Sequence, residues 1–280
     1  MRWKGLILFW LLVLVSGVLM LAWFQHRMIY HPRSYGSFYH QYFTGSLQRV
    51  SYQTPEGSQT SFYQPPPDGN HPEALWILFG GNASLALDWM WLVEVASKPG
   101  LGFLLIDYPG YGDCDGSASP EKIIASSEIA WDYWQEIYGN TEIPRLGILG
   151  HSLGAATALQ LAERIPVDRV LLLSPFTSVA DMVRKMFGAW LVPLLRHRFE
   201  NMGPLLQLLQ RETPPAITIF HGTRDEVIPV EMGRKLAALD PQRIRYHELR
   251  HSHHNTILKD ALPMILQEIH SIPGLESENQ

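Results

Sequence analysis

The stretch RLGILGHSLGAATALQLAER, residues 145–164, fits one local structure: a strand, a sharp turn and a helix. Residues 146–149 are a short apolar run of the kind that forms a strand buried on both faces. Residues 153–164 are rich in alanine and leucine and predict a helix. Ser152 lies on the turn between them, in the pentapeptide GHSLG. A serine on such a turn is typical of a nucleophile, because the turn projects its hydroxyl above the sheet.

The immediate neighbours of the serine fit the same interpretation. Gly150 and Gly154 leave room for a turn so sharp that the serine backbone is strained. The backbone amide of Leu153 stands at a helix N-terminus, where it can stabilise a developing oxyanion. A second oxyanion donor is expected from the loop after an early strand, and the sequence FGGNA of residues 79–83 makes the amide of Asn82 that donor. Asn82 can serve equally as the cap residue of a plain strand-to-helix turn.

The chain around this stretch alternates short apolar runs with helical segments. The apolar runs, rich in leucine and isoleucine, lie at residues 74–79, 101–106, 146–149, 170–174 and 216–220. The clearest helical segments lie at residues 84–97, 120–138, 152–164 and 229–239. An antiparallel hairpin, residues 48–54 and 59–64 around a Pro-Glu-Gly turn, precedes them. This order predicts an α/β domain with a mostly parallel sheet of about eight strands flanked by helices.

The domain boundaries follow from where this alternation starts, pauses and stops. We expect residues 46–273 to form the α/β domain. Residues 176–213 interrupt it with a helical pattern, which predicts either ordinary helices packed on the sheet or a small cap over the site. We expect a mixture, a short cap-like insertion that shapes one wall of the site. Residues 274–280 are predicted to be a flexible polar tail.

The N-terminus differs from the rest of the chain. Residues 6–24 carry no charge and would form a helix of about 28 Å, close to the hydrocarbon thickness of a bilayer. We interpret residues 1–25 as an uncleaved signal anchor, a transmembrane helix, and residues 26–45 as a juxtamembrane connection. A cleaved signal peptide is the alternative, but no small-x-small cleavage site follows the apolar run.

The flanking charges bear on the orientation of this helix. Arg2, Lys4 and the terminal amine precede the apolar run, and Arg27 and Arg33 follow it. The positive-inside rule then favours an N-terminus in the cytoplasm and a domain outside it. The sequence therefore predicts a single-pass membrane protein with an extracytoplasmic domain.

Composition excludes several classes of function. The formal net charge of −5 gives no basic footprint, so we expect no nucleic-acid partner. Cys114 is the single cysteine, which rules out an intramolecular disulfide and a multi-cysteine zinc site. The histidines of residues 251–254 stand beside no carboxylate or cysteine at ligand spacing, so we expect no metal and no cofactor.

A nucleophilic serine needs a base and an orienting acid, which in this arrangement follow in the order serine, acid, histidine. Asp225 is the best acid, because it lies in the segment HGTRDEVIP of residues 221–229, at the C-terminal end of the strand predicted at residues 216–220. Glu226 competes with it but is better placed to flank the next helix. Asp107 also follows a strand, but it precedes the serine and is in the wrong order.

The base is expected in the sequence HSHHN of residues 251–255. Three histidines, His251, His253 and His254, lie within four residues. Spacing alone does not choose among them.

The sequence resembles the BEM46-like (α/β-hydrolase domain-containing 13-like) serine hydrolases from about residue 30 to residue 266. The similar segments are GNA at 81–83 in the oxyanion loop, DYPGYGDCDG at 107–116, GHSLG at 150–154, SPFTS at 174–178, HGTRDEVIP at 221–229 and HN at 254–255. The resemblance implies the α/β-hydrolase fold, and it selects His254 as the base, with Ser152 as nucleophile and Asp225 as acid.

These expectations combine into one predicted function. The chain would be a serine hydrolase that cleaves ester-type bonds (carboxylic ester, lipid ester or thioester) through an acyl-enzyme, with a small-molecule or lipid acyl ester as substrate. The alternatives are a serine peptidase of the prolyl-oligopeptidase-like type and a non-catalytic, membrane-tethered binding protein that keeps the fold.

Overall fold

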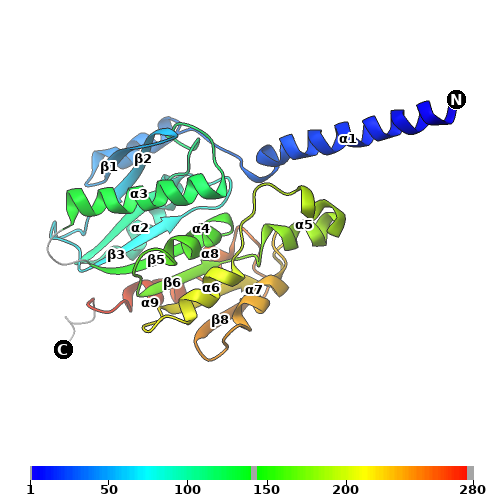
Figure 1. The fold of residues 1–280 in the computed structure, drawn as a ribbon. Coiled ribbons are helices and arrows are strands. Elements are labelled where there is room, and N and C mark those ends of the chain that lie inside the picture. The colour runs from blue at the N-terminus through cyan, green and yellow to red at the C-terminus, as the bar shows by residue number, and fades with distance from the viewer. Residues whose placement is uncertain (1, 140–143, 276–280) are drawn as a thin grey trace.

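The computed structural model describes residues 2–139 and 144–275. Within these ranges eight strands form one sheet, in the order β1–β2–β4–β3–β5–β6–β7–β8 (Figure 1). The strands are β1 (Gln48–Thr54), β2 (Gly57–Gln64), β3 (Ala74–Phe79), β4 (Leu101–Ile106), β5 (Arg145–His151), β6 (Arg169–Leu173), β7 (Ala216–Gly222) and β8 (Ile244–Leu249). The pairs β1–β2 and β2–β4 are antiparallel, and the other pairs are parallel. The predicted fold class is confirmed.

Burial explains which strands the sequence made easy to recognise. Every residue of β3 and β4 is buried, because helices cover both faces of the sheet there. In β8 only Ile244 is buried, and charged residues occupy the solvent side of this edge strand. The apolar runs of the sequence therefore correspond to the buried central strands, and they do not predict the edge strand β8.

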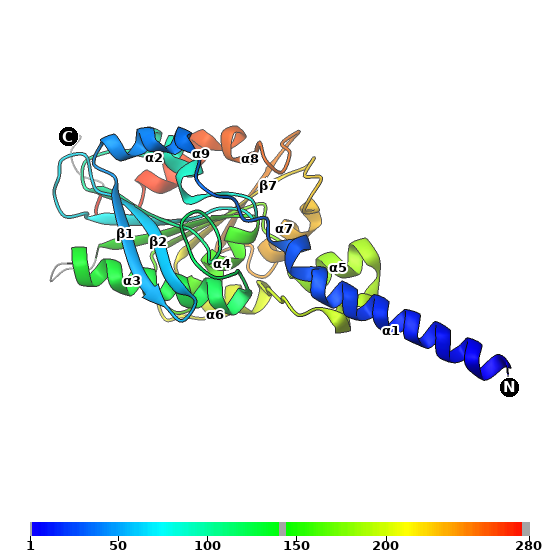
Figure 2. The same cartoon turned by 90° about the horizontal axis from the view of Figure 1, so that it is seen from above.

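Helices cover the two faces of the sheet in separate groups. They are α1 (Arg2–Ile29), α2 (Met90–Ala96), α3 (Pro120–Tyr138), α4 (Leu153–Ala162), α5 (Val179–Phe187), α6 (Met202–Leu209), α7 (Val230–Ala237), α8 (Ile257–Asp260) and α9 (Leu262–His270), with 3₁₀ turns η1 (Ser37–Thr44), η2 (Ala86–Trp89) and η3 (Ala189–Leu194). Figure 2 shows α3, α4 and α6 on one face and α2, α8 and α9 on the other. The α/β domain is thus a three-layer sandwich.

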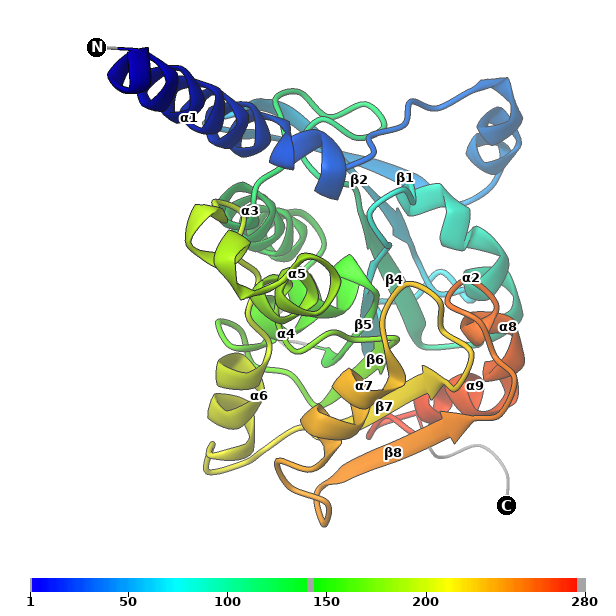
Figure 3. The ribbon, with the colours of Figure 1, turned by 90° about the vertical axis from the view of Figure 1, so that its right-hand side faces the viewer.

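Helix α1 projects away from the domain as one long rod (Figures 1 and 3). Its segment Trp3–Ile29 contains an 18-residue window with a mean hydropathy of 2.6 and is long and apolar enough to cross a bilayer, a test that a signal sequence also passes. The helix continues four residues past the predicted boundary at residue 25. The reason is local, because the side chain of Gln25 is buried against the domain.

The insertion at residues 176–213 has two different parts. Helix α5 and turn η3 contain no fully buried residue and stand over the carboxyl end of the sheet beside α1 (Figure 3). Helix α6 buries Leu205 and Leu208 and packs against α4 as an ordinary layer helix. Of the predicted tail, Leu275 is buried, and residues 276–280 lie outside the described residues.

Candidate active site

The turn between β5 and α4 has the strained geometry that the sequence predicts. Ser152 has φ 57° and ψ −115°, a left-handed backbone that a residue with a side chain rarely adopts. A Cβ at Gly150 would lie 2.1 Å from the carbonyl oxygen of Gly154, and a Cβ at Gly154 would lie 2.2 Å from that of Phe79. Neither position accepts a side chain, because the atoms in contact are backbone atoms. The serine thus stands at the carboxyl end of a central strand, at the start of a helix.

The predicted acid and base are in direct contact. Nδ1 of His254 lies 2.8 Å from Oδ2 and 3.0 Å from Oδ1 of Asp225. Oδ1 also accepts the amide hydrogens of Val227 and Ile228, at 3.0 and 2.7 Å. An ionised carboxylate only accepts hydrogen bonds, so Nδ1 of His254 carries the proton and Nε2 is left as the acceptor. No hydrogen bond joins Ser152 to the His254 ring in the described residues, although both line one cavity.

The environment of Asp225 keeps it ionised. Burial of this carboxyl alone would raise its pKa. The nearby side chains of His221 and His254 and the backbone amide of Ile228 outweigh burial and hold its pKa well below the usual value. The carboxylate is therefore a fixed negative charge that favours one orientation of the His254 ring.

The competing residues have other partners. Nδ1 of His253 lies 3.2 Å from Oε2 of Glu226, so a second, exposed acid–histidine pair stands beside the first. His251 has φ 69° and donates its backbone amide to the hydroxyl of Thr223. The histidines thus point to different groups, and no cluster of three metal-ligating side chains occurs in the part of the chain that the structure describes.

Asp107, the acid excluded on chain order, is buried away from the histidine. It accepts hydrogen bonds from the hydroxyl of Tyr35 and from the amide of Ala86. Burial raises its pKa to about 7, against the opposing effect of these two donors. Its role in the fold is to tie the segment before β1 and turn η2 to the end of β4.

The two residues predicted to supply oxyanion amides lie close to the serine in the structure. Leu153 is the first residue of α4, and Asn82 lies in the loop after β3; both line a cavity with Ser152. Among the hydrogen bonds of the described residues, none is donated by either amide. The carbonyl of Asn82 accepts from the hydroxyl of Tyr111 at 2.6 Å, and its side-chain Nδ2 donates to the carbonyl of Ile29 at 3.1 Å. These contacts fix the loop and leave its amide free.

Two further histidines, missed by the sequence analysis, belong to this arrangement. His151 donates its Nε2 hydrogen to the carbonyl of His254 at 3.0 Å. Burial, and next the proximity of His254, lower the pKa of His151 to about 4, so its ring is neutral at pH 7. His221 donates to the carbonyl of Ile228 at 2.9 Å and lies 3.5 Å from Asp225. The one sequence signal was the position of His151 inside the pentapeptide.

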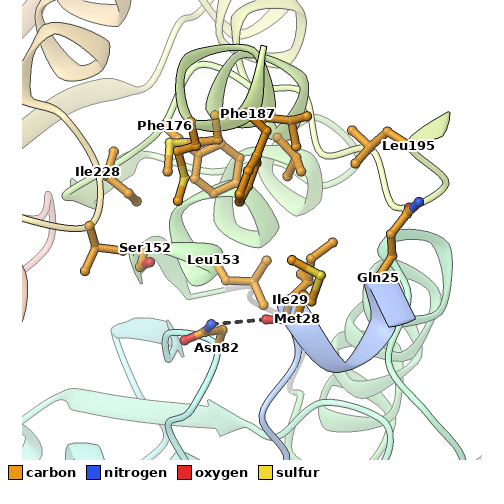
Figure 4. A pocket seen from close by; sticks show the side chains of 15 residues that line it. Gln25, Met28, Ile29, Asn82, Ser152, Leu153, Phe176, Phe187, Leu195 and Ile228 are labelled. Carbon is orange, nitrogen blue, oxygen red and sulfur yellow. Dashed lines mark hydrogen bonds between the residues drawn. The ribbon is translucent and has the colours of Figure 1, made fainter. Parts of the chain in front are cut away.

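Ser152 lies between an apolar and a polar cavity. The first, about 260 Å³, is lined by Gln25, Asn82 and otherwise apolar side chains, among them Phe176, Phe187 and Ile228 (Figure 4). The second, about 300 Å³, contains polar groups from Arg33, Asp88, His151, His254 and Asn255. Ser152 and Asn82 line both. A molecule with one apolar and one polar part could place its junction at the serine.

Comparison with known proteins agrees with this architecture. The alpha/beta hydrolase family matches residues 77–261. An uncharacterized protein of Mycobacterium tuberculosis (strain H37Rv) is 28% identical over 267 residues, which cover 91% of this chain and 92% of that protein. The lysophosphatidylserine lipase ABHD12 of Rattus norvegicus is 24% identical over 253 residues, which cover 80% of this chain and 62% of the lipase.

Solved structures show the same fold at low sequence identity. An alpha-beta hydrolase from Vibrio vulnificus superposes with a TM-score of 0.65 at 19% identity, covering 84% of this chain and 88% of that one. The Pyrococcus furiosus esterase PF2001 superposes with a TM-score of 0.64 at 14% identity, covering 87% and 96%. With its sheet order, its strand-to-helix serine turn and the family match across most of the domain, the chain belongs to the alpha/beta hydrolase family.

Proposed function

We propose that the protein is a serine hydrolase that cleaves carboxylic or lipid esters, or thioesters, through an acyl-enzyme on Ser152. The observation that carries this proposal is the bond from His254 to an ionised Asp225 beside a strained serine turn. The lipase and esterase named above are relatives in fold or sequence, and their activities support the reaction class. The two cavities support an ester with an apolar acyl part and a polar alcohol part.

The proposed reaction has two halves. Oγ of Ser152 attacks the ester carbonyl while Nε2 of His254 takes its proton, and the amides of Leu153 and Asn82 bind the resulting oxyanion. The C–O bond to the alcohol breaks, and the alcohol leaves with the proton from His254. Water then attacks the acyl-enzyme, giving its proton to His254, and the acid leaves as the proton returns to Ser152. Asp225 stabilises the imidazolium in both halves.

The Ser152→Ala variant tests the proposal. We expect it to abolish labelling by a fluorophosphonate probe and hydrolysis of p-nitrophenyl acyl esters, because no other group replaces the lost hydroxyl. The Asp225→Asn variant should lower kcat on the order of 10⁴-fold, and the His254→Ala variant on the order of 10⁶-fold. Labelling that persists in Ser152→Ala would contradict the assignment of the nucleophile.

The neighbouring acid–histidine pair supplies a matched control. His253→Ala and Glu226→Gln carry the same chemical changes one residue away, in a pair that is largely exposed. We expect both to keep most of the activity. If His253→Ala is inactive and His254→Ala is active, the base has been assigned to the wrong histidine.

The same assays separate the alternatives. A peptidase of the prolyl-oligopeptidase-like type would cleave peptide amides faster than esters, whereas the apolar lining of the first cavity favours acyl groups. A non-catalytic binding protein would not react with the probe at all. Esters of increasing acyl length then define the substrate class.

We also propose that the chain belongs to the BEM46-like branch of the family. Support comes from residue 251, where that branch has glycine: His251 takes a left-handed φ of 69°, the conformation that glycine favours. Position 80, where the branch has histidine, is glycine here, and a Cβ would lie 2.5 Å from the Cβ of Ser84. At position 80 the chain therefore departs from the branch, and the side chain of Ser84 occupies the space that a side chain at this position would need.

For the N-terminus we propose a retained single-pass anchor within residues 1–25, with the domain of residues 46–273 outside the cytoplasm. The length and hydropathy of α1 support a span. The basic residues Arg2 and Lys4 at its start support a cytoplasmic N-terminus.

A further inference from the structure

The last turns of α1 belong to the apolar cavity. Gln25, Met28 and Ile29 line this cavity together with Ser152. In Figure 4, Met28 and Ile29 lie across from Phe187, with Ser152 farther along the cavity. A helix that only attached the domain to a membrane would not need to reach the nucleophile.

Three hydrogen bonds fix this end of α1 to the site. Gln25 donates through Nε2 to the carbonyl of Leu194 at 2.7 Å and accepts through Oε1 from the amide of Arg196 at 2.8 Å. The carbonyl of Ile29 accepts from Nδ2 of Asn82 at 3.1 Å. The buried amide of Gln25 therefore joins α1 to the end of η3, and Ile29 joins it to the proposed oxyanion loop.

The residues at the outer end of the cavity are exposed. The exposed fractions are 53% for Met28, 62% for Met186 and 47% for Phe187, although all three line the cavity. Trp190, on the adjoining η3 turn, is 70% exposed. These side chains form an apolar mouth between α1 and the α5–η3 segment.

This mouth lies close to the end of the apolar span. The uncharged run of α1 ends at Phe24, four residues or about 6 Å along the axis before Met28. If α1 spans the bilayer, the mouth stands at the membrane surface, where tryptophan side chains such as Trp190 are favoured. Gln25, His26 and Arg27 separate the apolar run from Met28, which lies about one helical turn beyond its end.

We propose that α1 is a substrate-binding element as well as an anchor. Met28 and Ile29 form one wall of the acyl pocket, and the mouth between α1 and α5–η3 admits the acyl chain of a membrane lipid ester directly from the bilayer. Methionines at positions 28, 182 and 186 give the pocket a lining that adapts to a flexible chain. This inference rests on the proposed function. It adds the path by which the substrate enters and the residues that form one wall of its pocket.

The acyl-length preference tests the wall. In full-length protein reconstituted into phosphatidylcholine vesicles, Met28→Trp should narrow the pocket and lower kcat/KM for a lauroyl ester relative to a butyryl ester by about tenfold or more. Met28→Ala should shift the preference the other way. Met20→Trp is the matched control, because Met20 is an exposed methionine of the same helix, 62% exposed, and does not line the cavity.

The mouth is tested with Trp190→Glu, which places a charge where the membrane is expected. Hydrolysis of a long-chain ester embedded in the vesicles should fall severalfold, and hydrolysis of a soluble short-chain ester should not change. Ile137→Glu is the control, since Ile137 is exposed near the end of α3, a helix that ends on the side of the domain away from α1 (Figure 1).

The outcomes separate this inference from the proposed function. Absence of fluorophosphonate labelling in the wild-type protein overturns the proposed function. If labelling is present but Met28→Trp, Met28→Ala and Met20→Trp share one acyl-length profile, Met28 does not form a wall of the acyl pocket. If Trp190→Glu and Ile137→Glu lose hydrolysis of the vesicle ester equally, or if neither loses it, the substrate does not enter through the mouth between α1 and α5–η3.

Discussion

His151 lies next to the proposed base, His254, and forms a hydrogen bond with its backbone carbonyl. Its Nε2–H donates to the carbonyl of His254, and the two rings lie 4.8 Å apart between centroids. A proton added to His151 would place a charge in a buried site beside His254, which is why its pKa falls to about 4. Asp225 and His221 are the other titratable groups that act on it. This residue therefore links the stability of the site to pH.

We predict that His151 destabilises the folded state as the pH falls from about 6.5 to about 4, whereas Asp107, whose pKa is raised to about 7, stabilises it over the same range. The pKa of His151 drops from 6.5 in the unfolded chain to about 4 in the folded protein, so the unfolded state binds the extra proton in this window. The shift corresponds to roughly 3 kcal/mol for this partly exposed histidine. The lowered pKa of Asp225 acts separately, at pH below its ordinary value of 3.8.

The measurement is the thermal midpoint as a function of pH. His151→Gln keeps an N–H donor but does not titrate, so the midpoint of the variant should rise relative to that of the wild type as the pH is lowered from 6.5 to 4. Parallel curves for the two proteins would show that another group controls stability in this range.

Sequence reasoning finds some residues of this site and misses others for a physical reason. Ser152 and Asp225 each follow a buried strand, so a local pattern and the chain order point to them. His254 is separated from His251 and His253 only by the family resemblance. The bond from His151 to His254 joins residues 103 positions apart, and no local pattern encodes it.

At the scale of elements, one carboxylate ties the last helix to the sheet. Glu268 of α9 is buried and accepts from Arg169 of β6 at 2.7 Å and from Arg245 of β8 at 2.6 Å. The side chains of Glu268 and Arg169 are 7% and 13% exposed. The edge strand β8, which has few buried residues, is thus held partly through α9.

We predict that Glu268→Ala destabilises the protein by about 3 kcal/mol, because it leaves the charge of the mostly covered Arg169 with no carboxylate and only the carbonyl of Ser271 as acceptor. Glu248→Ala is the matched control. It removes a well-formed but exposed pair with Arg234 and should cost less than about 1 kcal/mol. The midpoints of urea unfolding of the two variants give the comparison, and equal midpoints would contradict the role given to Glu268.

The same elements mark where sequence patterns stop being informative. Strand β8 reads IRYHEL, without an apolar run, because an edge strand exposes most of its side chains. The seven other strands were all predicted within a few residues. The split of residues 176–213 into a cap and a layer helix depends on what α5 and α6 each pack against, which the sequence does not contain.

At the scale of the whole molecule, the anchor and the site lie at the same end. The serine stands at the carboxyl edge of the sheet, and α1 leaves the domain beside α5 at that edge (Figure 3). In open α/β sheets this edge is where ligands bind. The domain is therefore oriented with its proposed substrate entrance toward the side from which α1 extends.

We predict that the full-length protein stays in the membrane pellet after alkaline carbonate extraction, because the proposed anchor keeps its apolar span. Mass spectrometry of the purified chain should include the peptide of residues 5–27, and a chain that begins after residue 25 would show that the span is cleaved. Protease added to sealed cells should digest the domain if it is extracytoplasmic, whereas protection of the domain would reverse the proposed orientation.

The two hydrogen bonds of the Gln25 side chain have a mechanical consequence. Two hydrogen bonds from one buried side chain stop α1 from rotating or pivoting against the domain. If the helix is held in a bilayer, as proposed, Ser152 sits at one fixed height above the lipid. The protein would then select substrates by the depth of their ester group, hydrolysing only those esters whose carbonyl can reach the height of Ser152.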